Sequence, residues 1–283
     1  RAATTSTLAS LGPGERSELE TTLAVKVGTL ALGGLFARCT IFPAERIAIN
    51  IFAKELAYKR TELVDEMVDL DLDLDASDHD AMDLVRRAAG RYPWPIRDSL
   101  KVANDAAYLS KHTSEFSSLA DELESAVLGG RIIVSELGEV QFAPAALEGT
   151  HLQVHLAASV VKSLSSLVFY FRHLARRNDF IIIDEPELNL HPDNQRRIAR
   201  ILAKAVQQGF KVMISTHSDY ILREFNQLIM LSRLSAEQRA ELGREPDTAV
   251  VPSRIGVYLF DNHTATPVPV EETGFSVRTI DEV

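Results

Sequence analysis

The sequence predicts an α/β fold with a parallel sheet, flanking helices and a short helical insertion. The first observation is an apolar run rich in β-branched residues, Phe180 to Ile183, which is typical of a strand buried on both faces. The second is an amphipathic pattern from Asp193 to Gln208, which predicts a helix that ends at Gly209. The third is another apolar run, Lys211 to Thr216, which predicts a second buried strand. Strand, helix and strand in this order form a right-handed βαβ unit.

Polar side chains follow both predicted strands at the point where each strand ends. Asp184 and Glu185 come directly after the first strand, and His217 comes directly after the second. Ligands of open α/β sheets bind outside the carboxyl ends of the strands, so we expect these three side chains at one edge. Adjacent carboxylates point in different directions, so one can hold a metal-bound water while the other faces a reacting water. The alternative, a buried strand capped by incidental acids, does not account for the histidine on the next strand.

The residues of this edge resemble a known set of motifs. Asp-Glu-Pro-Glu-x-x-Leu-His-Pro, followed by Ser-Thr-His-Ser, resembles the Walker B, D-loop and switch-histidine run of ABC-type ATPases. It is similar to the OLD, RecF and SMC-like branch and not to transporter ATPases. The resemblance implies that Asp184 holds Mg²⁺ through water, that Glu185 polarises the attacking water and that His217 contacts the γ-phosphate of ATP. It places Asn189 and His191 in the D-loop position, at an interface beside the nucleotide.

A serine near the start of a predicted helix is a second candidate contact with the nucleotide. The helix runs from Ala157 to His173, and a helix N-terminus with a serine is a ready anion site. By its position between a hairpin and the Walker B strand, this segment resembles the ABC signature. It departs from Leu-Ser-Gly-Gly-Gln because Val160 and Val161 stand where glycines would be. Ser159 is the leading candidate and Lys162 the second; the alternative for Ser159 is an ordinary N-cap.

An arginine follows the short strand predicted at Cys39 to Phe42. Similar Pro-Ala-x-Arg segments follow a strand in OLD-like ATPases, near the Q-loop position of ABC ATPases. The resemblance makes Arg46 a candidate for sensing the nucleotide or for coupling it to the arm. The alternative is an ion pair with a neighbouring carboxylate such as Glu45. A helix from Ile47 to Arg60 is expected next.

We divide the chain into three parts. Residues 1–60 are assigned to the ATPase core, 61–129 to an acidic connector and helical arm insertion, and 130–283 to a C-terminal ATPase lobe. An ATPase of this kind needs the phosphate-binding sequence Gly-x-x-x-x-Gly-Lys-Ser/Thr. The nearest match, Gly28 to Leu35, lacks both the lysine and the hydroxyl residue. We therefore expect the Walker A motif upstream of this chain, which begins with arginine.

The remaining segments have simpler interpretations. The alternating aspartates between Asp65 and Asp83 fit no Ca²⁺-loop register and predict a solvated connector. His151 and His155 have the spacing of one helix face, but without a third ligand we interpret them as surface residues. The other predicted elements are a helix at 15–36, helices at 96–112 and 114–128, a hairpin at 131–142, a helix and then a strand within 219–231, a polar helix within 235–247, a strand at 254–260 and a closing hairpin at 258–277.

Composition limits the compartment and the partners. The formal net charge of −10 gives no overall basic footprint for nucleic acid, although a local basic groove stays possible. The single cysteine, Cys39, allows no intrachain disulfide, which fits a reducing cytoplasm. The longest apolar run, Val27 to Ala37, is too short to span a bilayer, so we expect no membrane partner.

The combined expectation is an ATP-binding and hydrolysing subunit that uses Mg²⁺ and drives or gates a partner effector. By resemblance, the effector would be a nuclease in an anti-phage system such as Septu or PARIS. One Walker B motif and one signature segment in the chain imply a homodimer or a higher homo-oligomer. Two alternatives remain open: a RecF-like ATPase of DNA repair or recombination, and an assembly scaffold that binds ATP with little hydrolysis.

Overall fold

The computed structural model describes residues 36–53, 92–243 and 248–276. Most of the helix expected at 15–36, the nearest match to a Walker A motif at 28–35 and the acidic connector lie outside the described residues. So does the second half of the helix expected at 47–60, whose first half is helical from Arg46 to Ala53. The division of the chain into three parts stays a prediction.

A three-stranded parallel sheet forms the centre of the described structure. Its order is β1 (Cys39–Phe42), β5 (Phe180–Asp184) and β6 (Lys211–Ser215). All neighbours are parallel, and Asp184 is paired with Ser215. Helix α9 (Pro192–Gln207) connects β5 to β6. The predicted α/β fold with a parallel sheet and flanking helices is therefore confirmed, including both strands and the helix of the βαβ unit.

The main core lies on one face of this sheet. Ile181 and Ile183 of β5 are 0% and 2% exposed, and they belong to a cluster that includes buried residues of α7 (Ser117–Leu123), α8 (Ser159–Phe169) and α9. On β6 the exposed residues alternate with partly buried ones, and Met213 is 50% exposed. The prediction that β6 is a buried strand was wrong, because among the described residues only one of its faces packs against the core.

The segment before β2 contains shorter helices than predicted. The helix expected at 96–112 is divided into α5 (Trp94–Asn104) and α6 (Ala106–Leu109), because Asp105 leaves helical geometry between them. The helix expected at 114–128 is α7 followed by a π-helical turn, Glu124–Leu128. Asp105 is the C-cap of α5 and the N-cap of α6, with a φ of −89° and a ψ of 8°.

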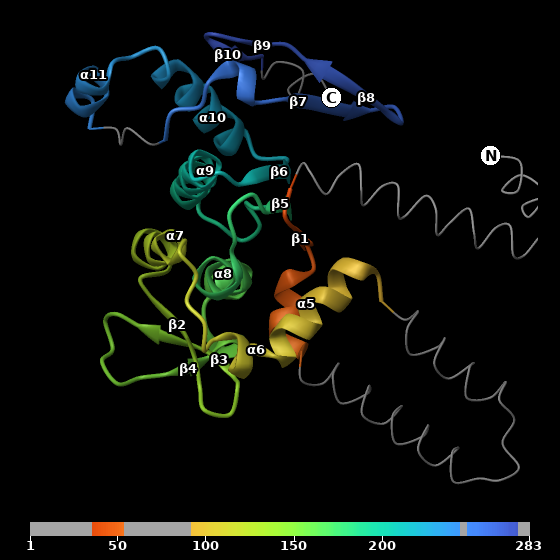
Figure 1. Ribbon diagram of the computed structural model, residues 1–283, viewed down its shortest axis with the longest axis vertical. Helices are drawn as coiled ribbons and strands as arrows, with labels where there is room; N and C mark the ends of the chain where they lie inside the picture. Colours follow the sequence, from red (N-terminus) through yellow and green to blue (C-terminus); the bar gives the residue numbers. More distant parts are fainter. Residues whose placement is uncertain (1–35, 54–91, 244–247, 277–283) are drawn as a thin grey trace, which may run out of the picture.

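A small antiparallel sheet follows. It contains β2 (Gly130–Val134), β3 (Val140–Pro144) and β4 (Leu152–Gln153), so the predicted hairpin is confirmed. A short 3-10 turn, Val154–Leu156, leads into α8, which continues as a π-helical turn, Tyr170–Leu174. Figure 1 shows this sheet at one end of the molecule, with the parallel sheet in the middle.

The C-terminal part occupies the other end of the molecule in Figure 1. Helix α10 (Asp219–Leu231) is continuous, so the strand expected within 219–231 was wrong; Ser218 caps the helix and residues such as Ile221 and Leu228 are buried. The remaining elements are α11 (Ala236–Glu241), a 3-10 turn (Pro252–Arg254), and the hairpins of β7 (Val257–Asp261) with β8 (Thr264–Val268) and β9 (Val270–Glu271) with β10 (Gly274–Phe275). None of the helices in the described ranges is both long and apolar enough to cross a bilayer.

Candidate functional site

The predicted site residues meet at the carboxyl ends of β5 and β6. Asp184 is the last residue of β5 and is exposed, and the hydroxyl of Ser215 donates a hydrogen bond to its Oδ1 atom. The backbone N–H of Glu185 donates to the Ser215 carbonyl at 3.0 Å, which extends the strand pairing by one step. His217 follows two residues after β6 and is also exposed. The register therefore brings Asp184, Glu185 and His217 to the same sheet edge.

The turn after β5 holds its glutamate in an unusual backbone conformation. Glu185 has a φ of 46°, in the left-handed region that few residues other than glycine adopt. Such strain concentrates at functional sites, where the surrounding structure must maintain it. Here the guanidinium of Arg46 donates to the carbonyl oxygens of Asp184 and Glu185, at 2.6 Å in each case. These two bonds fix the peptide groups on both sides of the strained residue.

Arg46 also connects this turn to two other elements. It is 3% exposed, and its Nε and Nη2 atoms donate to the carbonyl and hydroxyl oxygens of Ser163 in α8, at 3.1 and 3.3 Å. A fifth bond reaches the Pro43 carbonyl after β1 at 3.2 Å. Burial lowers the pKa of Arg46, and the charges of Asp184 and the nearby glutamates oppose that shift. Arg46 thus links the end of β1, α8 and the turn after β5, whereas a nucleotide contact and coupling to the arm both stay predictions.

Glu187 is a site residue that the sequence analysis missed. Its Oε1 atom accepts a hydrogen bond of 2.8 Å from the backbone N–H of His217. Its Oε2 atom is buried and has no hydrogen-bond partner among the described residues. Glu187 therefore ties the turn after β5 to the residue after β6. The available signal was an additional carboxylate within the same turn, two positions after Glu185.

The D-loop candidates lie on the surface of the same turn. Asn189 is exposed and has a φ of 61°, a conformation that asparagine tolerates better than most residues. His191 is the N-cap of α9, and its Nδ1 atom accepts from the backbone N–H of Asp193 at 3.3 Å. Gln195 braces the turn, because its amide donates to the Leu190 carbonyl at 2.9 Å and accepts from the Ser218 hydroxyl at 2.5 Å. His191 therefore has a structural role whatever else it contacts.

The signature candidates lie apart from this network. Ser159 is the first helical residue of α8, whereas the N-cap position belongs to Ala158 and has no side-chain cap. The interpretation of Ser159 as an ordinary N-cap was therefore wrong. Ser159 is exposed, and Lys162 is partly buried with its carbonyl bonded to Asn50 at 2.8 Å. Within the described ranges, no hydrogen bond joins Ser159 to the β5–β6 edge.

Asp184 is the predicted metal ligand of this edge, whereas His151 and His155 were expected to be surface residues. His151 precedes β4 and His155 lies in a 3-10 turn, so the two do not share a helix face. In the part of the chain that the structure covers, no group of three or more His, Cys, Asp or Glu side chains is arranged to hold a metal ion. Mg²⁺ in phosphate-binding sites commonly takes only one or two carboxylates and completes its shell with water and phosphate. An exposed aspartate beside the Ser215 hydroxyl fits that requirement.

Comparisons with known proteins give one family match and two structural likenesses. A family model described as "AAA ATPase domain" matches residues 37–222. No curated protein matches the chain. A structure from a study of ATP-driven dimerization and DNA-stimulated activation of SMC ATPases is 12% identical over 64% of this chain and 95% of that one, with a TM-score of 0.37. The Smc head domain from Pyrococcus furiosus, bound to the C-terminal domain of ScpA, is 16% identical, with a TM-score of 0.29 over 63% of this chain and 50% of that one.

These two likenesses are too weak to support any argument about function, because both TM-scores are below 0.5. The family match is of a different kind. It covers more than half of the chain, from the residues before β1 to the start of α10. That range includes Arg46, His217 and the turn after β5 that contains Glu185 and Glu187. The chain belongs to the AAA ATPase domain family.

Proposed function

We propose that this chain is the ATP-binding and ATP-hydrolysing part of an ABC-type ATPase that acts as a homodimer and drives or gates a partner effector. The observation that carries the proposal is the edge formed by Asp184, Glu185 and His217. It combines an exposed carboxylate, a strained glutamate and a histidine at the carboxyl ends of two parallel strands. Such an edge is where open α/β sheets bind their ligands.

Each of the three residues has a distinct task in this proposal. Asp184 would hold Mg²⁺ through water, and the bound ion would neutralise charge on the phosphates. Glu185 orients and polarises the water that attacks the γ-phosphate, and its backbone is fixed for that task by Arg46. His217 contacts the γ-phosphate, and Glu187 holds its backbone in place. Positioning of this kind accounts for much of the catalysis in phosphoryl transfer.

Ser159 serves the active site of the second subunit. The N-terminus of α8 presents N–H groups and an exposed serine, and its N-cap residue has no capping side chain. Free N–H groups at a helix N-terminus bind phosphate. Since Ser159 has no bond to its own β5–β6 edge within the described residues, we assign it to the ATP of the partner. Asn189 and His191 lie on the exposed turn of the same interface.

The decisive experiment replaces Glu185 with glutamine in the full-length protein. The amide keeps the size of the side chain but cannot polarise water, so single-turnover hydrolysis is expected to fall about 10²–10⁴-fold. Binding of ATP, measured by equilibrium titration, should stay within a few-fold of wild type. Glu148→Gln, at an exposed position outside this edge, is the control and should hydrolyse ATP normally. Hydrolysis by Glu185→Gln within a few-fold of wild type would refute the assignment.

The identity of the effector rests on the resemblance of the Asp-Glu-Pro-Glu segment to OLD-like ATPases. We propose a nuclease of an anti-phage system, and co-purification of a nuclease with the full-length protein supports that choice. Salt-dependent binding of DNA by the ATPase alone would instead indicate a repair enzyme, since phosphate contacts release counterions. Assembly on ATP without release of phosphate would indicate a scaffold.

A further inference from the structure

Gln195 joins the two segments that carry the proposed catalytic residues. It lies near the start of α9, and its side-chain amide makes two hydrogen bonds. The Nε2 atom donates to the carbonyl of Leu190, in the turn after β5, at 2.9 Å. The Oε1 atom accepts from the hydroxyl of Ser218, which follows β6, at 2.5 Å. A single side chain therefore spans both segments of the edge.

The chemistry of its partners fixes the orientation of this amide. A carbonyl oxygen can only accept, so the NH₂ group must face Leu190 and the amide oxygen must face Ser218. The Ser218 hydroxyl donates its one proton to Gln195 and accepts from the backbone N–H of Ile221 at 3.2 Å, as the N-cap of α10. Ser218 is 8% exposed, so loss of the amide would leave a buried hydroxyl donor without a partner, at a cost of about 1–3 kcal/mol.

Two side chains in the described ranges link the turn after β5 to the residues directly after β6. Glu187 accepts from the backbone N–H of His217, and Gln195 holds Ser218, the next residue along the chain. The backbone of the histidine is thus held at two consecutive residues. Both links start from the turn or from its carbonyl oxygen at Leu190.

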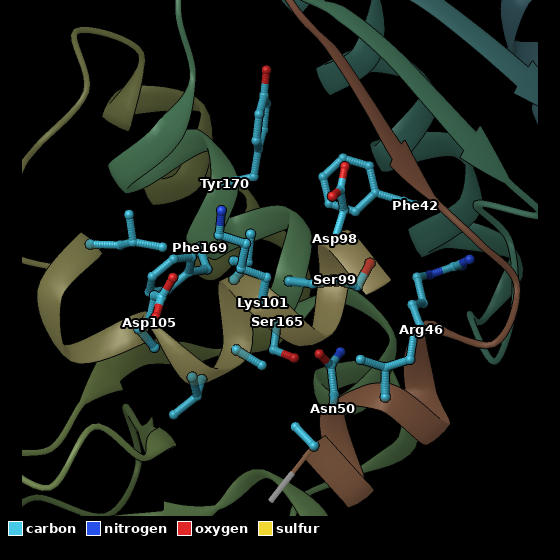
Figure 2. A pocket seen from close by; sticks show the side chains of 18 of the residues that line it. Phe42, Arg46, Asn50, Asp98, Ser99, Lys101, Asp105, Ser165, Phe169 and Tyr170 are labelled. Carbon is cyan, nitrogen blue, oxygen red and sulfur yellow. The ribbon is translucent and has the colours of Figure 1, made fainter. Parts of the chain in front are cut away.

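Arg46 fixes the start of the same turn but does not reach the histidine. Figure 2 shows Arg46 at the edge of a cavity of about 600 Å³, with its guanidinium pointing away from Ser165. The guanidinium bonds to carbonyl oxygens at the start of the turn and to α8, and within the described structure no bond joins it to the residues after β6. The placement of His217 therefore falls to Glu187 and Gln195.

We propose that Gln195 is a positioning residue that makes the placement of His217 depend on the turn after β5. Asn189, which is exposed, lies between Glu187 and Leu190, the two points of the turn that are linked to the residues after β6. The position of the exposed turn thereby sets the position of the histidine. The effect on hydrolysis rests on the proposed function, whereas the link itself does not.

Hydrogen exchange tests the link in the absence of any reaction. Gln195→Met keeps the length of the side chain and removes both bonds, so amides within 217–221 should exchange at least about five-fold faster in the full-length protein. The control is Gln207→Met, near the other end of the same helix, which removes an amide bond of 2.6 Å to the Ala249 carbonyl. It should leave exchange at 217–221 unchanged. Equal exchange in Gln195→Met and wild type, both folded by circular dichroism, overturns the link.

The rate of hydrolysis tests the step from the link to His217. Gln195→Met should slow single-turnover hydrolysis about 2–12-fold, the effect of one net hydrogen bond, with ATP affinity within about two-fold of wild type. In a His217→Ala background the same substitution should have no further effect, because a positioning residue acts only through the group that it positions. Gln207→Met should change the rate in neither background. Equal slowing by Gln195→Met with and without His217 would show a structural role and overturn the positioning role.

Gln195→Glu decides whether the turn takes part. Glutamate keeps an acceptor for the Ser218 hydroxyl but has no donor for the Leu190 carbonyl, so hydrolysis should fall as it does in Gln195→Met. A wild-type rate for Gln195→Glu would remove the turn from the mechanism. If the wild-type protein hydrolyses no ATP, the proposed function and the step to hydrolysis both fail, and the exchange measurement decides the link by itself.

Discussion

The proposed ATP site has two halves, the β5–β6 edge and the N-terminus of α8. They differ in how many hydrogen bonds within the chain hold them in place. At the β5–β6 edge, Arg46 and Gln195 donate hydrogen bonds to backbone carbonyls of the turn, and Glu187 accepts one from the backbone N–H of His217. At the N-terminus of α8, the N-cap residue has no capping side chain and Ser159 is exposed. The first half is preorganised within one subunit, and the second presents unsatisfied groups to an outside partner. The difference favours catalysis in one subunit that is completed by another.

Apart from Glu185→Gln, the largest effect is expected from blocking the exposed half. Ser159→Arg in the full-length protein should reduce hydrolysis about 10²–10³-fold, because it places a bulky cation where the phosphate of the partner must sit and removes a hydroxyl donor. The melting temperature should stay unchanged, since the Ser159 side chain makes no hydrogen bond within the described residues. Normal hydrolysis by this variant would remove Ser159 from the site.

Mixing two inactive proteins tests whether the halves belong to different subunits. A mixed dimer contains one Ser159→Arg subunit and one Glu185→Gln subunit. One of its two ATP sites then contains both substitutions, and the other contains neither. Activity should therefore return to about a quarter of wild type after random exchange of subunits in a symmetric dimer. Mixtures that stay inactive after verified exchange would show that Ser159 does not act across the interface.

The next effect concerns the preorganised half. Arg46→Ala leaves buried carbonyl oxygens without their charged donor, so the free energy of unfolding should fall by about 3 kcal/mol. Ser159→Ala is the matched control in the other half and should change stability by less than about 0.5 kcal/mol. Urea denaturation measures both values. If the two variants lose similar stability, the contrast between the halves is wrong.

A somewhat smaller effect is expected at the histidine of the edge. His217→Ala should slow single-turnover hydrolysis about 10²-fold, because a donor to the γ-phosphate is lost. The side chain is exposed and its backbone bond to Glu187 is retained, so the melting temperature should hardly change. A sharp loss of thermal stability, together with loss of protection by ATP, would make His217 a structural residue.

The sequence predicted the parts of this molecule that depend on local pattern. The βαβ unit from Phe180 to Ser215 has strong apolar periodicity and clear end signals, so its strands, its helix and the edge that they form could be inferred. The break at Asp105 and the continuous helix α10 were missed. Over short stretches, capping and tertiary packing outweigh the helix and strand propensities of the residues. The exposed face of β6 was missed because an apolar run does not show whether anything covers its second face.

The contacts that organise the site were harder to infer because they are distant in sequence. Arg46 bonds to residues 117 to 139 positions away, and nothing near it in the sequence identifies backbone carbonyls as its partners. The same limit applies to Glu187 and His217, which are 30 residues apart. Sequence motifs located the chemical groups of the edge, but the residues that position them became visible only in three dimensions.

Glu187 therefore provides the finest test of the preorganised half. Its Oε1 atom accepts from the N–H of His217, and its Oε2 atom is buried without a partner in the described structure. Glu187→Gln keeps an acceptor for that N–H, whereas Glu187→Leu removes it at similar volume. A net hydrogen bond of about 0.5–1.5 kcal/mol predicts that Glu187→Leu slows hydrolysis about 2–12-fold, and that Glu187→Gln retains most of the wild-type rate.

Rates from single turnover, with ATP affinity measured separately, distinguish loss of positioning from loss of binding. Equal rates for all three proteins would show that the backbone of His217 is held without Glu187. An equally severe loss in both variants would assign the negative charge of Glu187, rather than its bond to His217, to the reaction.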